Sequence, residues 1–377
     1  MLAQYLVIIL SLSVNAHGEQ VHPKSLNEGY QGGIELDDKG NLAAVLLHKG
    51  TKINDSGNTD VEAWLFSAAK GKTVYVGLNF YMDKSFEKKL LYKVKAYAYL
   101  AAFTKAVQMR FWGLTTPRVE IVFSASLWLI TEQESKIEVE ESTGKLDGRK
   151  TLEKLADFVA GQPPTVEKSD VVILLTGLNV TDGEDSTVQG VSYYAGACSP
   201  KRVAIVEDDG RTFKGANAAA QQVAHLLGAT YDGTLPLANL CPASWGYIMS
   251  KNPNTWKHHR FSLCSEIMMR FSYGFEMLDR WTCLGTKPGE VYNQPLRLPS
   301  DSFTSLTKHS YCSAWKNAES AKKCKQSSTE YPCKFLCCST KNKPQNAVPA
   351  PDGSTCNKTM MCLGGKCEDI GEVKAPR

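Results

Sequence analysis

From about residue 72 to residue 284, apolar residues recur at spacings typical of strands and of helices in turn. The stretch KTVYVGLNFYMD has an apolar residue at every second position from Val74, which predicts a strand with a buried face. A single long helix is predicted next, capped by Asp83 or Ser85 and ending near Trp112, because apolar residues then follow helical spacing.

Three more strands and three more helices are predicted in the same region. RVEIVFSASLWLI and RVAIVED have strand patterns, and the continuous apolar run SDVVILLTG predicts a strand covered on both faces. The acidic interval EQESKIEVEESTGKLDG is turn-like and precedes a helix from about Thr151 to Val159. A later helix ends at Gly228, a residue suited to the left-handed position after a helix, and another follows Met249 through SLCSEIMMRFSYGFEML. Strands alternating with helices indicate an α/β domain.

The two ends of the chain differ from this middle region. Residues 1–16 resemble a secretory signal peptide, because their apolar run is too short for a membrane span and small residues precede His17. Residues 17–71 are polar with one short apolar run, LAAVLL, and show no core of their own. Residues 286–299 are rich in Pro and Gly, which predicts a linker to a separate domain at 300–377. No later segment is apolar enough to predict a membrane span.

The cysteine content predicts an extracellular protein, and the charge distribution bears on its partners. Twelve cysteines, eight of them between Cys312 and Cys367, are typical of an oxidising compartment and of a tail ordered by disulfides. Asn54, Asn179 and Asn357 begin glycosylation tripeptides. Residues 300–377 hold 12 Lys or Arg against 7 Asp or Glu, so this tail is either a solvated basic surface or a site for an acidic partner such as a sulfated glycan. The tail lacks the interleaved aromatic residues of a nucleic-acid binder, so no nucleic-acid partner is predicted.

The stretch AAAQQVAHLLGATYDG, residues 218–233, has the outline of a zinc site with its chemistry altered. In the metzincin pattern H-E-x-x-H-x-x-G-x-x-H, three histidines hold zinc and the glutamate takes a proton from zinc-bound water. Aligned on Gly228, the ligand positions hold Gln221, His225 and Tyr231, and the base position holds Gln222. Of the three zinc ligands and the general base of the pattern, only the histidine at position 225 remains.

The surroundings of this stretch keep more of the pattern. Asp232 and Gly233 follow it, CPASWGYIMS supplies a candidate Met-turn at Met249, and GVSYYAGACS and VAIVEDDG precede it in the expected order. On these motifs, residues 72–285 resemble the reprolysin (adamalysin) branch of the metzincins, which includes snake-venom, ADAM, ADAMTS and tick salivary metalloproteases. The tail motif PDGSTCNKTMMCLGGKC resembles the cysteine-rich module of the last two groups, and the likeness is greatest to the tick proteins.

This resemblance implies a metzincin-type α/β domain with a mixed sheet and long helices, followed by a small disulfide-rich domain. It also implies the disulfides Cys198–Cys283 and Cys241–Cys264. Gly228, Asp232 and Met249 are expected to maintain the fold. Residues 17–71 resemble the start of a prodomain, most of which is missing, and they hold no cysteine that could cap a zinc ion.

The altered residues are expected to cost the site its metal and its activity. Neutral amides are rare zinc ligands, and a phenol must lose a proton from a pKa near 10 before it can serve as one. Gln222 has no proton-accepting form near neutrality. The expected result is an empty cleft in which Gln221 hydrogen-bonds His225 and Tyr231 fills the space of the metal; a sluggish zinc site and an unforeseen chemistry remain as alternatives.

Three functions follow. The first is a secreted pseudoprotease without cofactor that binds extracellular proteins; resemblance to the tick proteins implies host haemostatic or matrix proteins as partners. The second is an active zinc metalloendopeptidase with atypical ligands. The third is a binding module that works through the basic cysteine-rich tail.

Overall fold

The computed structural model describes most of the middle of the chain and parts of both ends. The described residues are 30–36, 42–48, 73–90, 96–114, 117–139, 141–162, 169–234, 240–251, 257–276, 281–287, 299–300, 312, 322–323, 333–338 and 344–369. The predicted signal peptide, Asn54 and most of the predicted linker at 286–299 lie outside these residues.

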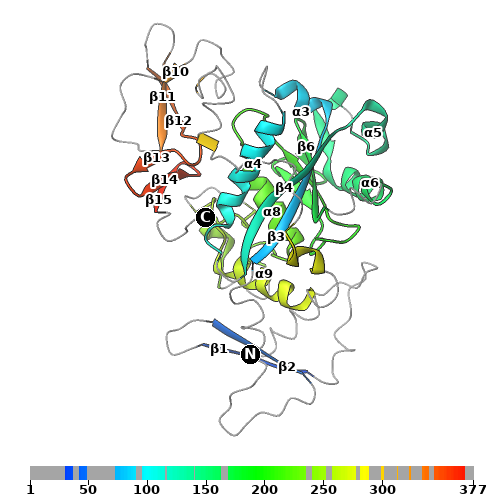
Figure 1. The fold of residues 1–377 in the computed structure, drawn as a ribbon, viewed down its shortest axis with the longest axis vertical. Coiled ribbons are helices and arrows are strands. Elements are labelled where there is room, and N and C mark those ends of the chain that lie inside the picture. The colour runs from blue at the N-terminus through cyan, green and yellow to red at the C-terminus, as the bar shows by residue number, and fades with distance from the viewer. Residues whose placement is uncertain are drawn as a thin grey trace.

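A five-stranded mixed sheet with the order β4-β3-β6-β9-β8 forms the centre of the molecule (Figure 1). All neighbouring strands run parallel except β8, which is antiparallel to β9. The strands are β3 (Thr73–Met82), β4 (Arg118–Trp128), β6 (Val171–Thr176), β8 (Gly190–Ser192) and β9 (Val203–Glu207). The four longer strands match the four predicted ones. The three residues of β8 are too few to show a pattern in the sequence.

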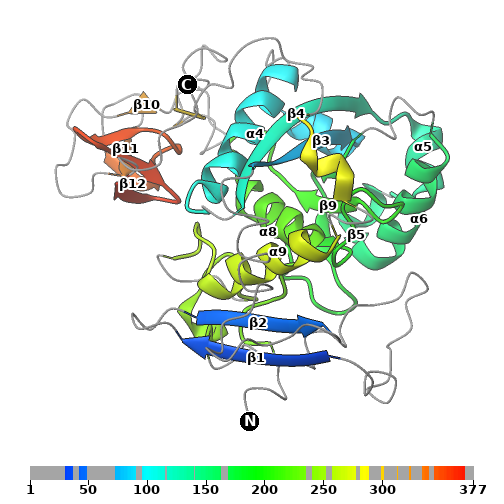
Figure 2. The same ribbon diagram turned by 60° about the horizontal axis from the view of Figure 1, so that its bottom comes forward.

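Helices cover both faces of this sheet (Figures 1 and 2). Helices α4 (Ala96–Phe111) and α8 (Ala216–Leu226) pack on one face, and α6 (Gly148–Ala160) packs on the other. Alternate residues of β6 enter the two cores, and all six are buried. The prediction that this strand is covered on both faces is confirmed.

The single long helix predicted after β3 is wrong, because the structure has two. Asp83 caps α3 (Lys84–Lys89) by accepting a hydrogen bond from the Phe86 N–H at 2.7 Å. At Leu90 the backbone leaves the helical conformation, with φ −57° and ψ 133°. The Arg211 Nε donates to the Lys89 carbonyl at 2.9 Å, so a distant loop takes an acceptor that a continuing helix would use. Periodicity along the sequence cannot reveal this tertiary contact.

The acidic interval predicted as turns also holds short regular elements. Helix α5 (Thr131–Lys136), the 3-10 turn η2 (Glu141–Thr143) and strand β5 (Lys145–Asp147) lie within it, and β5 pairs with β7 (Asn179–Thr181). These elements are too short to show a period, and charged side chains on their solvent side obscure the pattern.

The remaining described elements lie toward the two ends of the chain. A two-stranded hairpin of β1 (Tyr30–Leu36) and β2 (Leu42–His48) contains the LAAVLL run. Helix α9 (Leu263–Glu276) matches the last predicted helix, and the 3-10 turns η3 (Ala243–Trp245) and η4 (Trp281–Gly285) flank it in the sequence. The tail forms two small sheets: β10 (Lys322–Lys323), β11 (Lys334–Cys338) and β12 (Pro344–Pro349), then β13 (Thr355–Asn357), β14 (Met360–Leu363) and β15 (Lys366–Asp369).

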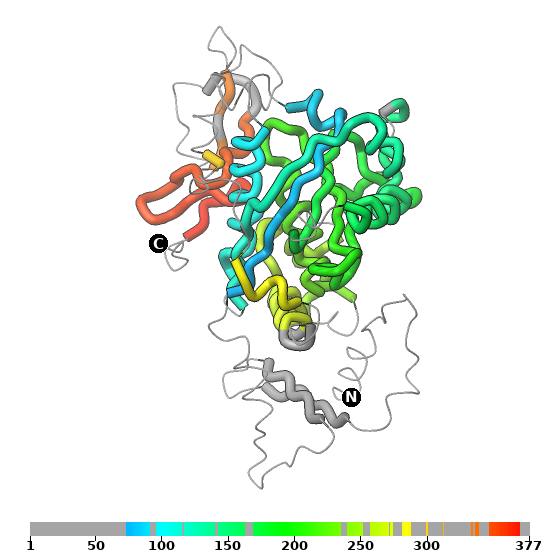
Figure 3. Tube along the Cα trace, turned by 45° about the vertical axis from the view of Figure 1, so that its right-hand side comes forward, coloured from blue at the N-terminus to red at the C-terminus, as the bar shows by residue number. Residues whose placement is uncertain are grey.

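The described part of the tail is fastened to the α/β domain beside α4 (Figure 3). Within the tail, the disulfides Cys312–Cys337, Cys333–Cys362 and Cys356–Cys367 join its segments. Arg110, buried on α4, forms an ion pair with Asp352. His259, fully buried, contacts Glu368 through its Nε2 at 3.0 Å. Removing the tail would therefore strand buried polar groups of the domain.

The outer strand β4 is partly shielded by a side chain. The Gln108 side chain, on α4, donates to the Val119 carbonyl at 3.0 Å and accepts from the Ile121 N–H. One amide group thus bonds the two backbone groups that a further strand would use. Among the described helices, none combines the length and apolarity needed to cross a membrane.

Candidate functional site

Helix α8 carries three of the four positions that a zinc protease of this pattern would use. It begins after Gly215 and ends at Leu226, and Gly228 then takes a left-handed conformation with φ +86°. A Cβ on residue 228 would lie 2.0 Å from the Ser272 Oγ of α9, so glycine is required by contact as well as by conformation. The predicted end of the helix at Gly228, with this residue in the left-handed conformation, is therefore confirmed.

His225 has the hydrogen bonding of a metal-ligand histidine. Its Nδ1 lies 2.8 Å from the Ala229 carbonyl oxygen, which can only accept, so Nδ1 carries the proton. The Nε2 atom then has a lone pair, is buried and has no hydrogen-bond partner among the residues that the structure describes. Burial lowers the pKa of His225 to about 4, opposed by the Ala229 carbonyl, so the imidazole is neutral at physiological pH.

The two glutamines form a directed hydrogen-bond chain across the floor of the site. The Ser192 hydroxyl, on β8, donates to the Gln222 Oε1 at 2.8 Å. The Gln222 Nε2 donates to the Gln221 Oε1 at 3.2 Å, and the Gln221 Nε2 donates to the Ile248 carbonyl at 2.7 Å. The two side chains thereby connect the edge strand of the sheet to the segment before Met249.

The expected hydrogen bond between Gln221 and His225 is wrong. The Gln221 amide is engaged by Ile248 and Gln222, and the Nδ1 of His225 is paired with the Ala229 carbonyl. The His225 Nε2 accepts from no group in the described part of the chain. Gln221 and His225 each bond a backbone carbonyl, that of Ile248 and that of Ala229, instead of the other's side chain one helical turn away.

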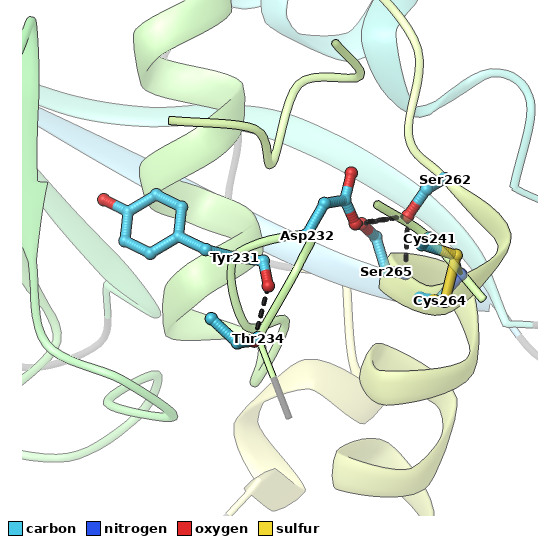
Figure 4. The surroundings of a disulfide bond; sticks show 7 residues. All are labelled: Tyr231, Asp232, Thr234, Cys241, Ser262, Cys264 and Ser265. Atoms are coloured by element: carbon cyan, nitrogen blue, oxygen red, sulfur yellow. Dashed lines mark hydrogen bonds between the residues drawn. A yellow bond between two sulfur atoms is a disulfide. The ribbon is translucent and has the colours of Figure 1, made fainter. Parts of the chain in front are cut away.

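Tyr231 packs on His225, as the expectation of a filled metal space requires. The two rings are 4.3 Å apart between centroids with an interplanar angle of 78°. Figure 4 shows that the side chains of Tyr231 and Asp232 point in opposite directions from the loop. Burial first, and then the charges of Asp182 and Asp185, raise the pKa of Tyr231, so its phenol keeps its proton.

Asp232 connects this loop to the segments around it (Figure 4). Its Oδ1 accepts from the Ser262 hydroxyl at 2.6 Å, and its N–H donates to the Met249 carbonyl at 2.9 Å. Met249 is fully buried in the core that also holds α8. Both residues thus occupy structural positions around the site.

The structure forms the two disulfides that the resemblance implies. Cys241 is bonded to Cys264, beside Ser262 and Asp232, and Cys198 is bonded to Cys283. The first connects the loop after Asp232 to the start of α9, and the second joins the loop before β9 to η4.

The residues at the ligand positions do not fit a zinc ion. One imidazole nitrogen is available, but its neighbours are an amide bonded elsewhere and a phenol that holds its proton. Two clusters of three metal-capable side chains occur among the described residues, and neither includes His225. Each contains cysteines that are joined in disulfides.

Two of the three predicted glycosylation positions can be placed. Asn357 is exposed at the end of β13, and its Oδ1 accepts from the Lys358 N–H at 2.7 Å. Asn179 is half-buried in β7, where its N–H donates to the Gly144 carbonyl at 3.1 Å. The Asn357 side chain is therefore the more open of the two.

Three partners in the site were not predicted from the sequence. Ser192, the Ile248 carbonyl and the Ala229 carbonyl complete the hydrogen bonds of the three α8 residues. Ser192 lies in a strand too short to predict, and backbone carbonyls leave no signal in a sequence. Of these three contacts, only the one between His225 and Ala229 could have been indicated by the sequence, because the two residues are four positions apart at the end of the helix.

Comparison with known proteins supports a reprolysin-like region. Residues 117–288 match the model of the family described as "Reprolysin (M12B) family zinc metalloprotease". A Bombyx mori protein named "A disintegrin and metalloproteinase with thrombospondin motifs like" is 26% identical over 293 residues, which cover 71% of this chain. Human "A disintegrin and metalloproteinase with thrombospondin motifs 16" is 29% identical over 214 residues, or 54% of the chain. "Venom metalloproteinase BumaMPs1" of Olivierus martensii is 28% identical over 202 residues, or 51% of the chain.

The matched region is only a part of each of these three relatives. It spans 40% of the Bombyx mori protein, 16% of the human protein and 50% of the venom protein. The chain is thus a homologue of reprolysin-type metalloproteases, with a mixed α/β domain and several disulfides. The closer likeness to tick salivary proteins stays a prediction.

Proposed function

We propose that this protein is a secreted, catalytically inactive homologue of the reprolysin metalloproteases and that it acts by binding extracellular proteins. The observation that carries the proposal is the hydrogen-bond chain from Ser192 through Gln222 and Gln221 to Ile248. Its amide groups occupy the positions of a zinc ligand and of the general base, and they are bonded to each other rather than directed at a metal.

The loss of chemistry that this arrangement implies is large. Structural zinc sites bind with roughly 10–16 kcal/mol, and exchanging two of three imidazoles removes on the order of half of that. General-base catalysis contributes about 10²–10⁴-fold, and an amide at position 222 provides none of it. The neutral Tyr231 ring covers His225, so no third ligand replaces the missing histidines.

Secretion is supported by the first 16 residues and by the cysteines. The apolar run before His17 has the length of the apolar core of a signal peptide, and cysteines in this number are typical of extracellular proteins. Extracellular proteins are therefore the proposed partners. Host haemostatic or matrix proteins remain the specific class that the resemblance to tick salivary proteins implies.

Zinc content and proteolysis test the proposal together. The full-length protein, purified without added metal or chelator, is expected to contain far less than one zinc per chain by elemental analysis. Casein and fibrinogen are expected to stay intact, with or without chelator. Stoichiometric zinc together with chelator-sensitive cleavage would show instead an active endopeptidase with atypical ligands.

A further inference from the structure

The segment after Tyr231 has an unusual charge composition. From Gly233 to Ser265 the sequence contains no Asp or Glu, but it contains Lys251, Lys257 and Arg260 and two histidines. The described parts of this segment lie on the side of the site formed by the Tyr231 loop and the residues around Met249.

Three backbone hydrogen bonds join these parts into one wall. The Asp232 N–H donates to the Met249 carbonyl at 2.9 Å, and the Gly233 N–H donates to the Cys241 carbonyl at 2.8 Å. The Ile248 N–H donates to the Arg260 carbonyl at 2.9 Å. Residues 231–234, 240–251 and 257–260 therefore hold fixed positions relative to one another.

Lysine side chains lie over aromatic rings along this wall. The Lys257 Nζ is 5.3 Å from the centre of the Trp245 ring and 4.9 Å from that of Tyr247. The Lys251 Nζ is 5.6 Å from the centre of the Tyr231 ring. Cation–π attraction holds each ammonium group against a ring. The aromatic–lysine surface is defined here as Tyr231, Leu240, Trp245, Tyr247, Lys251 and Lys257.

The same surface exposes apolar area. Leu240 and Trp245 of this surface are each 45% exposed, and outside the defined set Leu263, next to Cys264 of the Cys241–Cys264 disulfide, is 62% exposed. These are three of the seven large hydrophobic residues that are exposed in the described part of the chain. Aromatic residues with apolar neighbours and a charged rim are typical of the centres of protein–protein interfaces.

Charges at the two limits of the surface define its polarity. Asp182 and Asp185 are near enough to Tyr231 to raise the pKa of its phenol, and hydrogen bonds from Thr187, together with the charge of Lys251, lower the pKa of Asp185. At the other end, Glu368 of the tail forms an ion pair with Arg260. Within residues 233–265 the ionisable side chains other than histidine and tyrosine are the cationic Lys251, Lys257 and Arg260, together with the disulfide-bonded cysteines, and no Asp or Glu occurs there.

We propose that the aromatic–lysine surface binds a segment of a partner protein that carries carboxylates beside apolar side chains. The inference rests on the proposed function, since it names the partner chemistry of a binding protein. Carboxylates complement Lys251 and Lys257, and apolar side chains cover Leu240 and Trp245. Exposed leucines contribute nothing to binding a sulfated glycan, so the apolar area favours a protein segment.

A short fluorescein-labelled peptide of alternating Glu and Leu is the probe, and its binding to the full-length protein is measured by fluorescence anisotropy. Two further peptides separate the contributions, one of alternating Glu and Ser and one of alternating Lys and Leu. The Glu-Leu peptide is expected to bind tightest, and the other two at least about tenfold more weakly, because each lacks one half of the complementarity.

Point variants locate the binding on the surface. Lys257→Glu and Trp245→Ser are each expected to weaken binding about tenfold, as loss of a charge partner and of an aromatic anchor does. Lys154→Glu, an exposed residue of α6, makes the same charge change elsewhere in the domain and is expected to alter binding less than about twofold. Thermal unfolding of each variant shows whether it is folded.

Three results would overturn the inference. They are equal binding of the Glu-Ser peptide, unchanged binding by folded Lys257→Glu and Trp245→Ser variants, and loss of binding with Lys366→Glu in the tail. Competition by a heparin octasaccharide that is equally strong against the Lys257→Glu variant would also assign the acidic ligand to another surface. Cleavage of the bound peptide in a zinc-containing sample would contradict the proposed function but leave the binding surface intact, so the two failures are distinguishable.

Discussion

The chain from Gln221 to Met249 contains two groups of residues whose situations differ. Gly228, Asp232 and Met249 are held by contacts to residues far along the sequence, such as Ser272 of α9 and Ser262 before it. Gln221 and Gln222 are held by side-chain hydrogen bonds to each other, to Ser192 and to the Ile248 carbonyl. Scaffold residues are constrained by packing, which any stable fold needs, whereas metal ligands are constrained together only through the ion. A fold of this kind can therefore keep its shape while the residues at its ligand and base positions form new hydrogen bonds.

The largest expected effect comes from restoring the two missing zinc ligands and the general base while the rest of the domain is left unchanged. The triple variant Gln221→His, Gln222→Glu, Tyr231→His is expected to gain one zinc per chain, because His225 already has the tautomer of a ligand. The gain in zinc binding should be about 5–8 kcal/mol, half of the affinity of a typical structural site. Isothermal titration with zinc measures it.

The matched control for the triple variant keeps Tyr231 and changes only the two glutamines. It is expected to bind zinc more weakly, since the third ligand is missing and the phenol covers His225. Equal zinc uptake by the unchanged protein and the triple variant would remove the distinction between the two groups of residues.

The next largest effect is expected at the scaffold residue Gly228. Gly228→Ala should lower the free energy of unfolding by about 2–5 kcal/mol, because it adds strain at φ +86° to a contact with Ser272. Chemical denaturation measures the change.

Two other glycines separate these two causes. Gly183 has φ +63° with nothing within 4 Å of an added Cβ, so Gly183→Ala reports conformational strain alone. Gly113 has an equally open surrounding and no left-handed φ, so Gly113→Ala should be near neutral or stabilising. The order of cost should be Gly228, Gly183, Gly113; a Gly228→Ala cost equal to that of Gly183→Ala would mean that α9 moves away freely.

A pH dependence of stability is expected from His225. Folding lowers its pKa from about 6.5 to about 4, so the folded state resists protonation. The stability that it contributes is complete above pH 6.5 and falls as the pH decreases to 4, by about 3 kcal/mol at 1.36 kcal/mol per pH unit. Denaturation at several pH values, compared with His225→Gln, measures this difference.

Buried carboxyl groups, Asp170 and Asp208 among them, act in the opposite direction and cancel in that comparison. Burial raises the pKa of Asp170 and of Asp208 to about 7, so both favour the folded state as the pH falls. Because both are present in the His225→Gln variant, the difference between the two proteins isolates His225. A difference that does not change between pH 7 and pH 4 would contradict the buried, neutral imidazole.

The smallest effect is expected from breaking the glutamine chain. Gln221→Leu should cost about 1–2 kcal/mol of unfolding free energy, because it removes the donor to the Ile248 carbonyl and leaves Gln222 without an acceptor. Gln162→Leu is the matched control, since its amide also donates to a carbonyl, that of Phe158, at the half-exposed end of α6. Equal costs would show that the chain does not stabilise the site beyond an ordinary surface bond.

The sequence predicted the parts of this molecule that local pattern determines. Four strands of the central sheet, the helix ending before Gly228 and the last helix follow from spacing alone. The break between α3 and α4 could not be predicted, because it depends on Arg211 reaching the Lys89 carbonyl across 122 positions.

In the candidate site the limit is of the same kind. The identities of Gln221, Gln222 and Tyr231 indicated that the site would not hold zinc well. Their actual hydrogen bonds involve Ser192 and the Ile248 carbonyl, from two segments whose proximity only the folded chain defines. The hydrogen bonds that a side chain can form depend on the backbone groups around it in the folded protein, and the sequence alone does not identify those groups.

The amide of Gln108 has a consequence for how molecules of this protein meet in concentrated solution. Because it bonds the Val119 carbonyl and the Ile121 N–H, the outermost strand offers an incoming chain an interrupted ladder. Two copies cannot continue one sheet into the next through this part of β4 without first displacing that side chain, and this requirement opposes fibre growth in the direction of the interstrand hydrogen bonds, perpendicular to the strands.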